Sequence, residues 1–137
     1  MLQTLAPRFG RRLLVLPCVY MGLIFALSQI PGNKLPTWDI QSISLGNLLH
    51  FPVYFGLGTL WLLTLNAWPV SGARSAALAI TFATVFGILD EVHQHFVPLR
   101  TMDPWDAIVN FAGASTAALT WGWIRPVFFG SKVPAPH

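Results

Sequence analysis

Charged side chains are scarce in this sequence. Only 9% of its 137 residues are Asp, Glu, Lys or Arg, whereas 54% are hydrophobic. Ordinary soluble domains carry about 25% charged residues, so this composition excludes a typical soluble globular protein and predicts an integral membrane protein. At this length the chain is expected to form a single domain over residues 1–137.

Cysteine and acidic residues are also rare. Cys18 is the only cysteine, which excludes an internal disulfide and a cysteine metal cluster. Five acidic residues stand against eight basic ones, but the basic residues are dispersed along the chain, so no nucleic-acid partner is expected. In a membrane protein, an excess of Lys and Arg instead indicates which loops face the cytoplasm.

The sequence does contain four apolar runs, each close to the length that a membrane-spanning helix needs. They predict an all-α, polytopic membrane protein folded as a compact bundle of four transmembrane helices. The expected helices cover about residues 13–30, 46–66, 76–96 and 104–124. Asp103 followed by Pro104 is a typical start for the last of them.

The segments between and around these helices are rich in turn-forming or basic residues. Residues 31–45 contain many turn-forming residues and are expected to form a loop. A basic head (1–12) and a basic, Pro-rich tail (125–137) flank a core at about 13–124. The first run also resembles a signal peptide with a cleavage site at Ala26-Leu27-Ser28, but the three further runs favour an uncleaved helix.

The charges are divided between the two ends of this bundle. If the N-terminus and C-terminus are cytoplasmic, the outer end holds Lys34, Arg100 and all five acids. The cytoplasmic end then holds the other basic residues, namely Arg8, Arg11, Arg12, Arg74, Arg125 and Lys132. This asymmetry obeys the positive-inside rule, and it predicts a multi-pass membrane protein with cytoplasmic termini and an acidic outer end.

Polar residues of all four expected helices fall at this outer end. Spacings of three or four residues place most of them on the inward faces of the helices. The predicted polar cluster consists of Ser28, Gln29, His50, Tyr54, Asp90, Glu91, Gln94, Arg100, Asp106 and Asn110. Glu91 lies about 100° from Asp90 around the helix, so it is expected nearer the rim.

Small residues continue two of these inward faces towards the cytoplasm. At four-residue steps they let membrane helices approach closely. The expected packing residues are Ala79, Ala83, Gly87, Gly113 and Ala117.

Acidic groups inside membrane segments are costly and usually serve a function, although the same side chains can act only as hydrogen bonds between helices. Arg100 is either the counter-charge of Asp90, Glu91 or Asp106, or an anchor at the membrane surface.

A metal site is conceivable from His50, Asp90, Glu91, His93 and His95. The spacing in DEVHQH does not reproduce the HExxH pattern, however, and His93 and His95 point to different sides of a helix. No metal centre and no cofactor are therefore expected.

Several of these residues together resemble the VanZ-like membrane proteins. The resemblance extends over about residues 20–115 and rests on Ser28-Gln29, His50 with Tyr54, DEVHQ at 90–94, Pro98, Arg100, and Asp106 with Asn110 and Gly113. It implies a small multi-span protein of the cell envelope. The family's namesake is associated with low-level resistance to the lipoglycopeptide teicoplanin, and no reaction is established for the family. Members often have Asp-Lys shortly before the histidine, where this chain has Gly46 and Asn47.

An outward-facing polar site at the depth of lipid headgroups predicts a non-catalytic or cryptically catalytic envelope protein that binds a lipid headgroup or a lipid-linked cell-wall precursor. Two alternatives stay open. An accessory subunit of a larger membrane protein complex would suit a chain with little mass outside the membrane and with small-residue helix faces. An intramembrane enzyme would use Asp90 or Glu91 as acid or base with His50 as partner, but the polar layer offers few nucleophiles. A channel or transporter is disfavoured because the sequence has no internal repeat.

Overall fold

The computed structural model describes residues 12–34, 39–40, 43–68, 70 and 72–129. Its four α-helices are α2 (Val15–Ser28), α3 (Leu45–Asn66), α4 (Gly72–Gln94) and α5 (Pro104–Phe129). The connection from α2 to α3 contains a 3-10 helix, η1 (Gly32–Lys34), and two short strands, β1 (Asp39–Ile40) and β2 (Ile43–Ser44). Arg8, Arg11 and Lys132, which contribute to the predicted charge asymmetry, lie outside the described residues.

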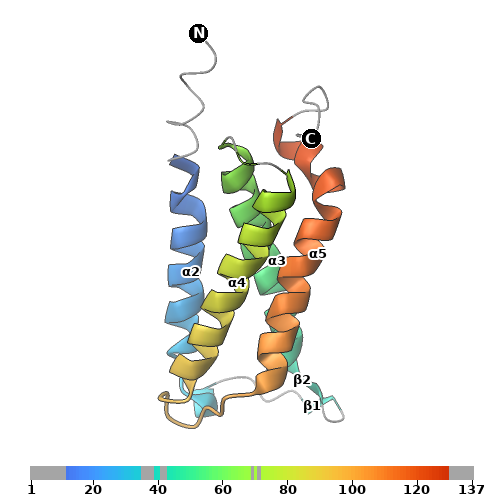
Figure 1. Cartoon of the computed structure of the whole chain (residues 1–137). Helices are drawn as coiled ribbons and strands as arrows, with labels where there is room; N and C mark the ends of the chain where they lie inside the picture. The colour runs from blue at the N-terminus through green and yellow to red at the C-terminus, as the bar shows by residue number, and fades with distance from the viewer. Residues whose placement is uncertain (1–11, 35–38, 41–42, 69, 71, 130–137) are drawn as a thin grey trace.

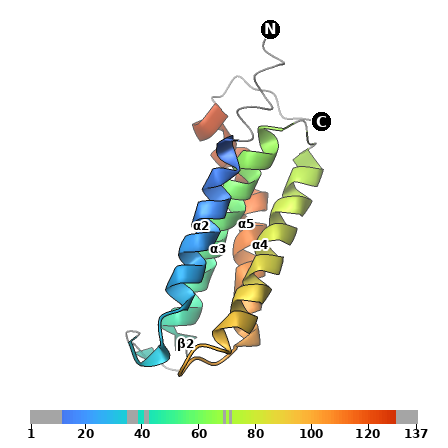
Figure 2. The same ribbon diagram turned by 90° about the vertical axis from the view of Figure 1, so that its left-hand side faces the viewer.

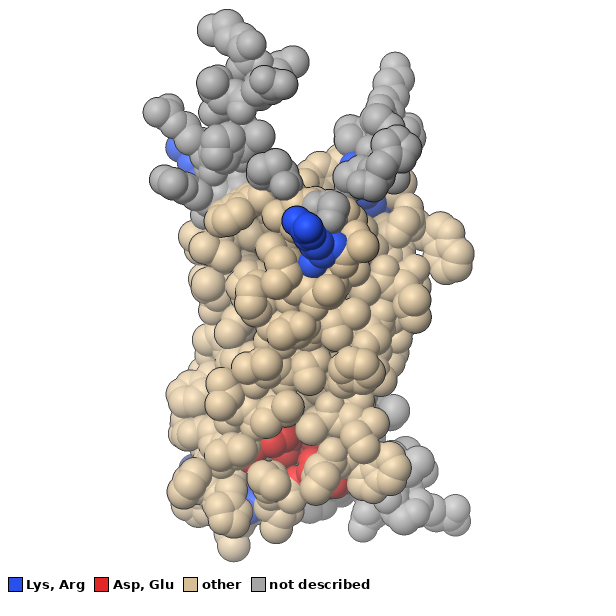
Figure 3. Space-filling view, viewed as in Figure 1, with Lys and Arg blue, Asp and Glu red and all other residues tan. Residues whose placement is uncertain are grey.

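Successive helices run in alternating directions, as Figures 1 and 2 show. The start of α2, the end of α5 and the helix ends where α3 meets α4 lie at one end of the bundle. The α2–α3 and α4–α5 connections lie at the opposite end, which we call the polar end. Figure 3 shows acidic atoms at the polar end and most of the visible basic atoms at the other.

The all-α prediction is confirmed, and the four helices occur in the expected order. The paired strands were not expected: Asp39 faces Ser44 and Ile40 faces Ile43 in a small antiparallel hairpin. The predicted end of the last helix near Ile124 is wrong, since α5 continues to Phe129 with Pro126 inside it. A proline this close to a helix end removes one backbone hydrogen bond, and the helix continues for only one further turn.

The core lies between α3, α4 and α5, and α5 packs most extensively against α3. Small side chains from α4 and α5 line this core: Ala79, Ala83 and Ala117 are completely buried. A Cβ atom at Gly113 would lie 2.5 Å from the carbonyl oxygen of Phe51, so only glycine allows this approach of the α3 and α5 backbones. The residues expected at packing positions thus lie in the interior of the bundle.

The first helix is attached more loosely than the other three. Its Tyr20 hydroxyl donates a hydrogen bond to the carbonyl oxygen of Val53 at 3.3 Å, which connects it to α3. Several of its apolar side chains remain on the surface, among them Val19 and Leu23 with 55% and 57% exposure. Helix α2 therefore covers one side of a core that the other three helices form.

One helix among the described residues, α4, is both long and apolar enough to cross a membrane, with a mean hydropathy of 1.6. Helix α2 is apolar but shorter. Four membrane-crossing helices accordingly stay a prediction, whereas the four-helix architecture itself is observed.

Candidate functional site

The last two turns of α4 carry three buried polar side chains: Asp90 and Glu91 are 3% exposed, and Gln94 is 4% exposed. A spacing of four residues places Asp90 and Gln94 on one face of the helix. The Gln94 amide nitrogen Nε2 donates a hydrogen bond to Asp90 Oδ2 at 3.1 Å. The end of α4 therefore supplies the centre of the site.

Helix α2 completes the environment of Asp90. Its last residue, Ser28, is buried, and its hydroxyl Oγ lies 2.6 Å from Asp90 Oδ1. Such a short O–H···O bond is typical of a charged carboxylate acceptor. We call Ser28, Asp90 and Gln94 the serine network. Both carboxylate oxygens of Asp90 have a partner within it.

A second group of side chains joins α3, α4 and α5. His50 comes from α3, Glu91 from α4, and Asp106 and Asn110 from α5; we call these four residues the histidine cluster. The imidazole Nδ1 of His50 lies 2.9 Å from Asn110 Oδ1 and 3.9 Å from Glu91 Oε1. Its Nε2 lies 3.7 Å from Asp106 Oδ2. The imidazole thus stands between two carboxylates.

Tyr54 supports the ring of His50 from the next turn of α3. The two rings are parallel, with an angle of 2° between their planes and 6.2 Å between their centroids. Tyr54 is only 1% exposed, and its hydroxyl has no hydrogen-bond partner among the described residues. The predicted pairing of His50 and Tyr54 on one side of this helix is therefore seen as a ring stack.

The expectation that Glu91 lies near the rim is wrong. Its side chain is buried and faces His50, and its Oε2 accepts a hydrogen bond from the backbone N–H of Asp103 at 3.4 Å. Asp90 faces Ser28 on α2, whereas Glu91, one residue further around the helix, faces α3 and α5. Two adjacent positions are buried because α4 has neighbours on both of these sides.

Two carboxylate oxygens in the histidine cluster lack a partner. Glu91 Oε1 and Asp106 Oδ1 are buried without a hydrogen bond from any described residue. Asn110 Nδ2 is in the same situation. An unsatisfied buried polar group costs about 1–3 kcal/mol. The cluster is therefore suited to hold a cation, or a ligand that offers hydrogen-bond donors.

Gln29 and Arg100 lie outside these two groups. The Gln29 amide Nε2 lies 2.7 Å from His93 Nε2 in an exposed contact, and the Phe25 ring covers His93 at 4.5 Å between centroids. Arg100 forms no ion pair with Asp90, Glu91 or Asp106 within 4.0 Å, although its charge acts on Asp106 from further away. Its guanidinium Nε is buried without a hydrogen-bond partner among the described residues.

The connection from α4 to α5 shapes the polar end. Asp103 Oδ1 accepts a hydrogen bond from the backbone N–H of Trp105 at 2.9 Å, so it caps α5 as its sequence position indicated. The backbone N–H of Gly32 donates to the carbonyl oxygen of Pro98 at 3.1 Å. Leu99, which follows Pro98, has a positive φ of 59°. The two connections of the polar end are therefore joined to each other by their backbones.

The residues that the structure brings together as possible metal ligands differ from the five that were weighed from the sequence. His93 and His95 take other contacts, with Gln29 and Phe96 respectively. His50, Glu91 and Asp106 instead each offer a ligand atom, and these atoms lie within 4.8 Å of one another. Asp106 was expected in the polar cluster but not as a metal ligand, because the three residues come from three different helices.

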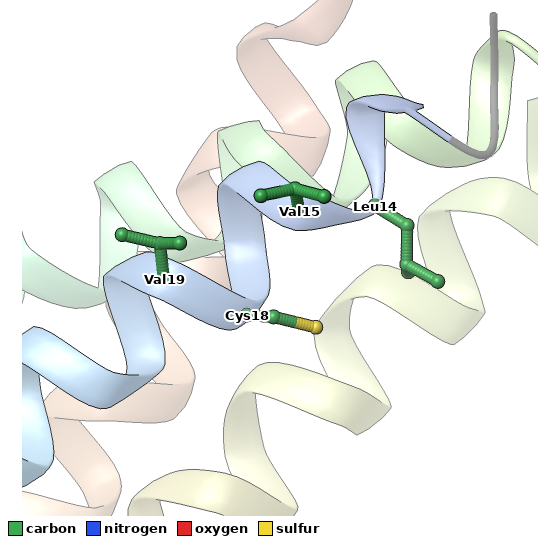
Figure 4. Close-up of a pocket in the computed structure, with 4 residues that line it drawn as sticks. All are labelled: Leu14, Val15, Cys18 and Val19. Carbon is green, nitrogen blue, oxygen red and sulfur yellow. The ribbon is translucent and has the colours of Figure 1, made fainter.

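The opposite half of the molecule contains a shallow, open hollow of about 350 Å³ on α2. It is lined by Leu14, Val15, Cys18 and Val19, all from this one helix (Figure 4). The lining is almost entirely apolar and has no acidic or basic side chain. It does not resemble a site for a polar ligand.

Comparison with models of protein families gives a match. A model of the family described as VanZ/LLP1 matches residues 9–125, which covers most of the chain and all of both polar groups. The resemblance inferred from the motif residues is thereby confirmed. Neither the comparison with curated proteins nor that with solved structures found a match.

Proposed function

Because this chain belongs to the VanZ/LLP1 family, we propose that it is a multi-pass protein of the bacterial cytoplasmic membrane. Its polar end would bind the headgroup of a membrane lipid or of a lipid-linked cell-wall precursor. The observation that carries this proposal is the convergence of Ser28, His50, Asp90, Glu91, Asp106 and Asn110 at one end of an otherwise apolar bundle.

The apolar surface of the bundle supports a membrane location. Leu119 and Trp123 of α5 are each 83% exposed, and Val127 is 81% exposed. Many large apolar side chains of α2 and α4 are exposed as well. In water these side chains would be an aggregation liability, whereas lipid tails accommodate them without cost. The rest of the bundle surface thus suits the hydrocarbon layer.

The distribution of charge supports an orientation with the polar end outside. Arg12 precedes α2, Arg74 lies in the first turn of α4 and Arg125 lies in the last turns of α5, and these three helix ends lie at the end of the bundle opposite the polar end. Basic residues collect on the cytoplasmic side of membrane proteins. The polar end then lies at the outer surface, where the headgroups of the outer leaflet and of cell-wall precursors are found.

The polar end offers complementary groups to such a headgroup. Membrane lipids and lipid-linked precursors share a phosphate, and the guanidinium Nε of Arg100 is buried without a hydrogen-bond partner among the described residues. The open oxygens of Glu91 and Asp106 accept hydrogen bonds from the ammonium or hydroxyl groups that lie beyond the phosphate. The serine network positions α2 and α4 around this site.

Native mass spectrometry of the protein extracted in mild detergent tests the proposal. The wild type is expected to retain a lipid, whose mass distinguishes a phospholipid from a lipid-linked precursor. Arg100→Gln should lose most of it. Lys34→Gln is the matched control, because Lys34 is an exposed basic residue at the same end. The proposal would be contradicted if the wild type and Arg100→Gln retained the lipid equally. It would also be contradicted if Arg100→Gln and Lys34→Gln lost the lipid equally.

A further inference from the structure

We propose that His50, Glu91 and Asp106 form a binding site for a divalent transition-metal ion. The three ligand atoms lie within 4.8 Å of one another. Two ligand atoms of one tetrahedral zinc ion lie about 3.3–3.6 Å apart, because metal–nitrogen and metal–oxygen distances are about 2.0–2.2 Å. Small side-chain movements therefore suffice to bring all three onto one ion.

The unpartnered oxygens are an independent sign of a missing ligand. Glu91 is 3% exposed, yet its Oε1 has no hydrogen-bond partner among the described residues and points towards His50. Asp106 Oδ1 is buried and unpartnered in the same cluster. Buried carboxylates are normally paired with a cation or bound to a metal. The ion pairs available to Glu91 and Asp106 within the described residues come only from His50, and a single imidazole cannot neutralise both.

The surroundings of His50 are those of a metal ligand. Asn110 Oδ1, a hydrogen-bond acceptor, lies 2.9 Å from Nδ1 and therefore favours the tautomer that carries its proton there. The lone pair of Nε2 is then directed towards Asp106 at 3.7 Å. Metal-binding histidines usually donate their other N–H to such an acceptor, which fixes the ring. The ring of Tyr54 stacks parallel to the imidazole and further restricts its orientation.

The ligand types indicate which ion the site would select. One imidazole and two carboxylates suit zinc, manganese or ferrous iron, whereas magnesium and calcium prefer oxygen ligands alone. Three protein ligands also leave at least one position of a four-coordinate ion open. The imidazole of His50 is 17% exposed, so the cluster can be reached from outside the bundle.

The role of this ion rests on the proposed function, although its binding does not. The buried carboxylates of Asp90, Glu91 and Asp106 repel the phosphate of a headgroup, and a divalent cation reverses the local charge. The open coordination position can then take a phosphate oxygen. The metal thus explains how an acidic site accepts an anionic lipid.

Binding of Zn²⁺ and Mn²⁺ to the chelator-treated, delipidated protein in detergent tests the site directly, because lipid plays no part in it. The wild type is expected to bind one ion and to melt at a higher temperature with the ion present. His50→Ala, Glu91→Gln and Asp106→Asn should each raise the dissociation constant for the metal more than about 100-fold. Loss of a residue that only hydrogen-bonds to a metal ligand has a smaller effect. His93→Ala is the matched control and should bind like the wild type. Absence of binding to the wild type at millimolar metal, or an equal loss in His93→Ala, would overturn the proposal.

Glu91→Gln separates loss of metal binding from loss of the fold. It removes a buried charge without changing the shape of the side chain, so the metal-free variant should melt no lower than the metal-free wild type. Only the increase in melting temperature that the metal produces should disappear. Arg100→Gln should keep metal binding, which distinguishes a failure of the lipid proposal from a failure of this one.

Discussion

Ser28 and Asp90 are 62 positions apart in the sequence, and their side chains meet at 2.6 Å between Oγ and Oδ1. This bond connects α2 to α4 at the polar end. Ser28→Ala leaves one oxygen of a buried carboxylate without its partner, so it should lower the free energy of unfolding by about 1–3 kcal/mol. Reversible unfolding in detergent or bicelles measures the change.

Thr116→Ala is the control for this prediction. The Thr116 hydroxyl donates to the carbonyl oxygen of Ala112 within α5, at 2.8 Å, and makes no contact of this kind with another helix. Its loss should change the stability by no more than about 0.5 kcal/mol. Equal effects of the two substitutions would show that the bond between Ser28 and Asp90 does not hold α2 in place.

Gly113→Ala should destabilise the bundle strongly. The added Cβ would lie 2.5 Å from Phe51 O and 2.9 Å from Phe55 N, and neither backbone atom can move without displacing α3. Overpacking of this kind costs about 1–3 kcal/mol. Gly122→Ala lies on the same helix and has nothing within 4 Å of its Cβ. That variant should be neutral or stabilised by up to about 1 kcal/mol. A comparison of the two melting temperatures tests both statements.

Asn110→Ala should weaken metal binding without removing a metal ligand. Asn110 orients His50 through the 2.9 Å contact with Nδ1 and is itself completely buried. Loss of a residue that hydrogen-bonds to a metal ligand raises the dissociation constant for the metal about 10–100-fold. Asn66→Ala is the control, because the Asn66 amide donates within its own helix to Leu62 at the other end of the bundle. Zinc titration should show a weaker site in the first variant and an unchanged one in the second.

The proposed orientation predicts which residues are reached from outside an intact cell. In a Cys18→Ser background, which removes the single native cysteine, a cysteine can be placed at either end of the bundle. Thr101→Cys lies in the exposed α4–α5 connection and should react with a membrane-impermeant thiol reagent. Arg74→Cys is exposed at the opposite end and should react only after permeabilisation. The reverse pattern would place the polar end in the cytoplasm.

The sequence predicts the helices and much of the polar end, because both depend on local patterns. Apolar runs of sufficient length predict four helices, and Asp103 with Pro104 places the start of α5 where it is observed. The four-residue spacing of Asp90 and Gln94 places them on one face, and they are found hydrogen-bonded there. These properties require only the geometry of a single helix.

The arrangement between helices could not be predicted in the same way. Glu91 is buried because α3 and α5 lie on its side of α4, and no pattern within α4 states which neighbours it has. The metal-ligand set of His50, Glu91 and Asp106 comes from three helices, so it has no characteristic spacing along the chain. Spacing along the chain argued against His93 and His95 as metal ligands, but it gave no sign that Glu91 and Asp106 meet at His50.

The backbone bond from Gly32 to Pro98 has a consequence for the order in which the bundle assembles. Helix α2 is made before α3, α4 and α5, but the partners that fix its polar end, Asp90 and Pro98, lie near the end of α4 and in the connection that follows it. Until they are synthesised, α2 has only α3 to hold it, through contacts such as that of Tyr20 with Val53. Helix α2 therefore stays incompletely fixed at its polar end until α4 and the connection after it have been made, and the site is complete only when α5 adds Asp106 and Asn110.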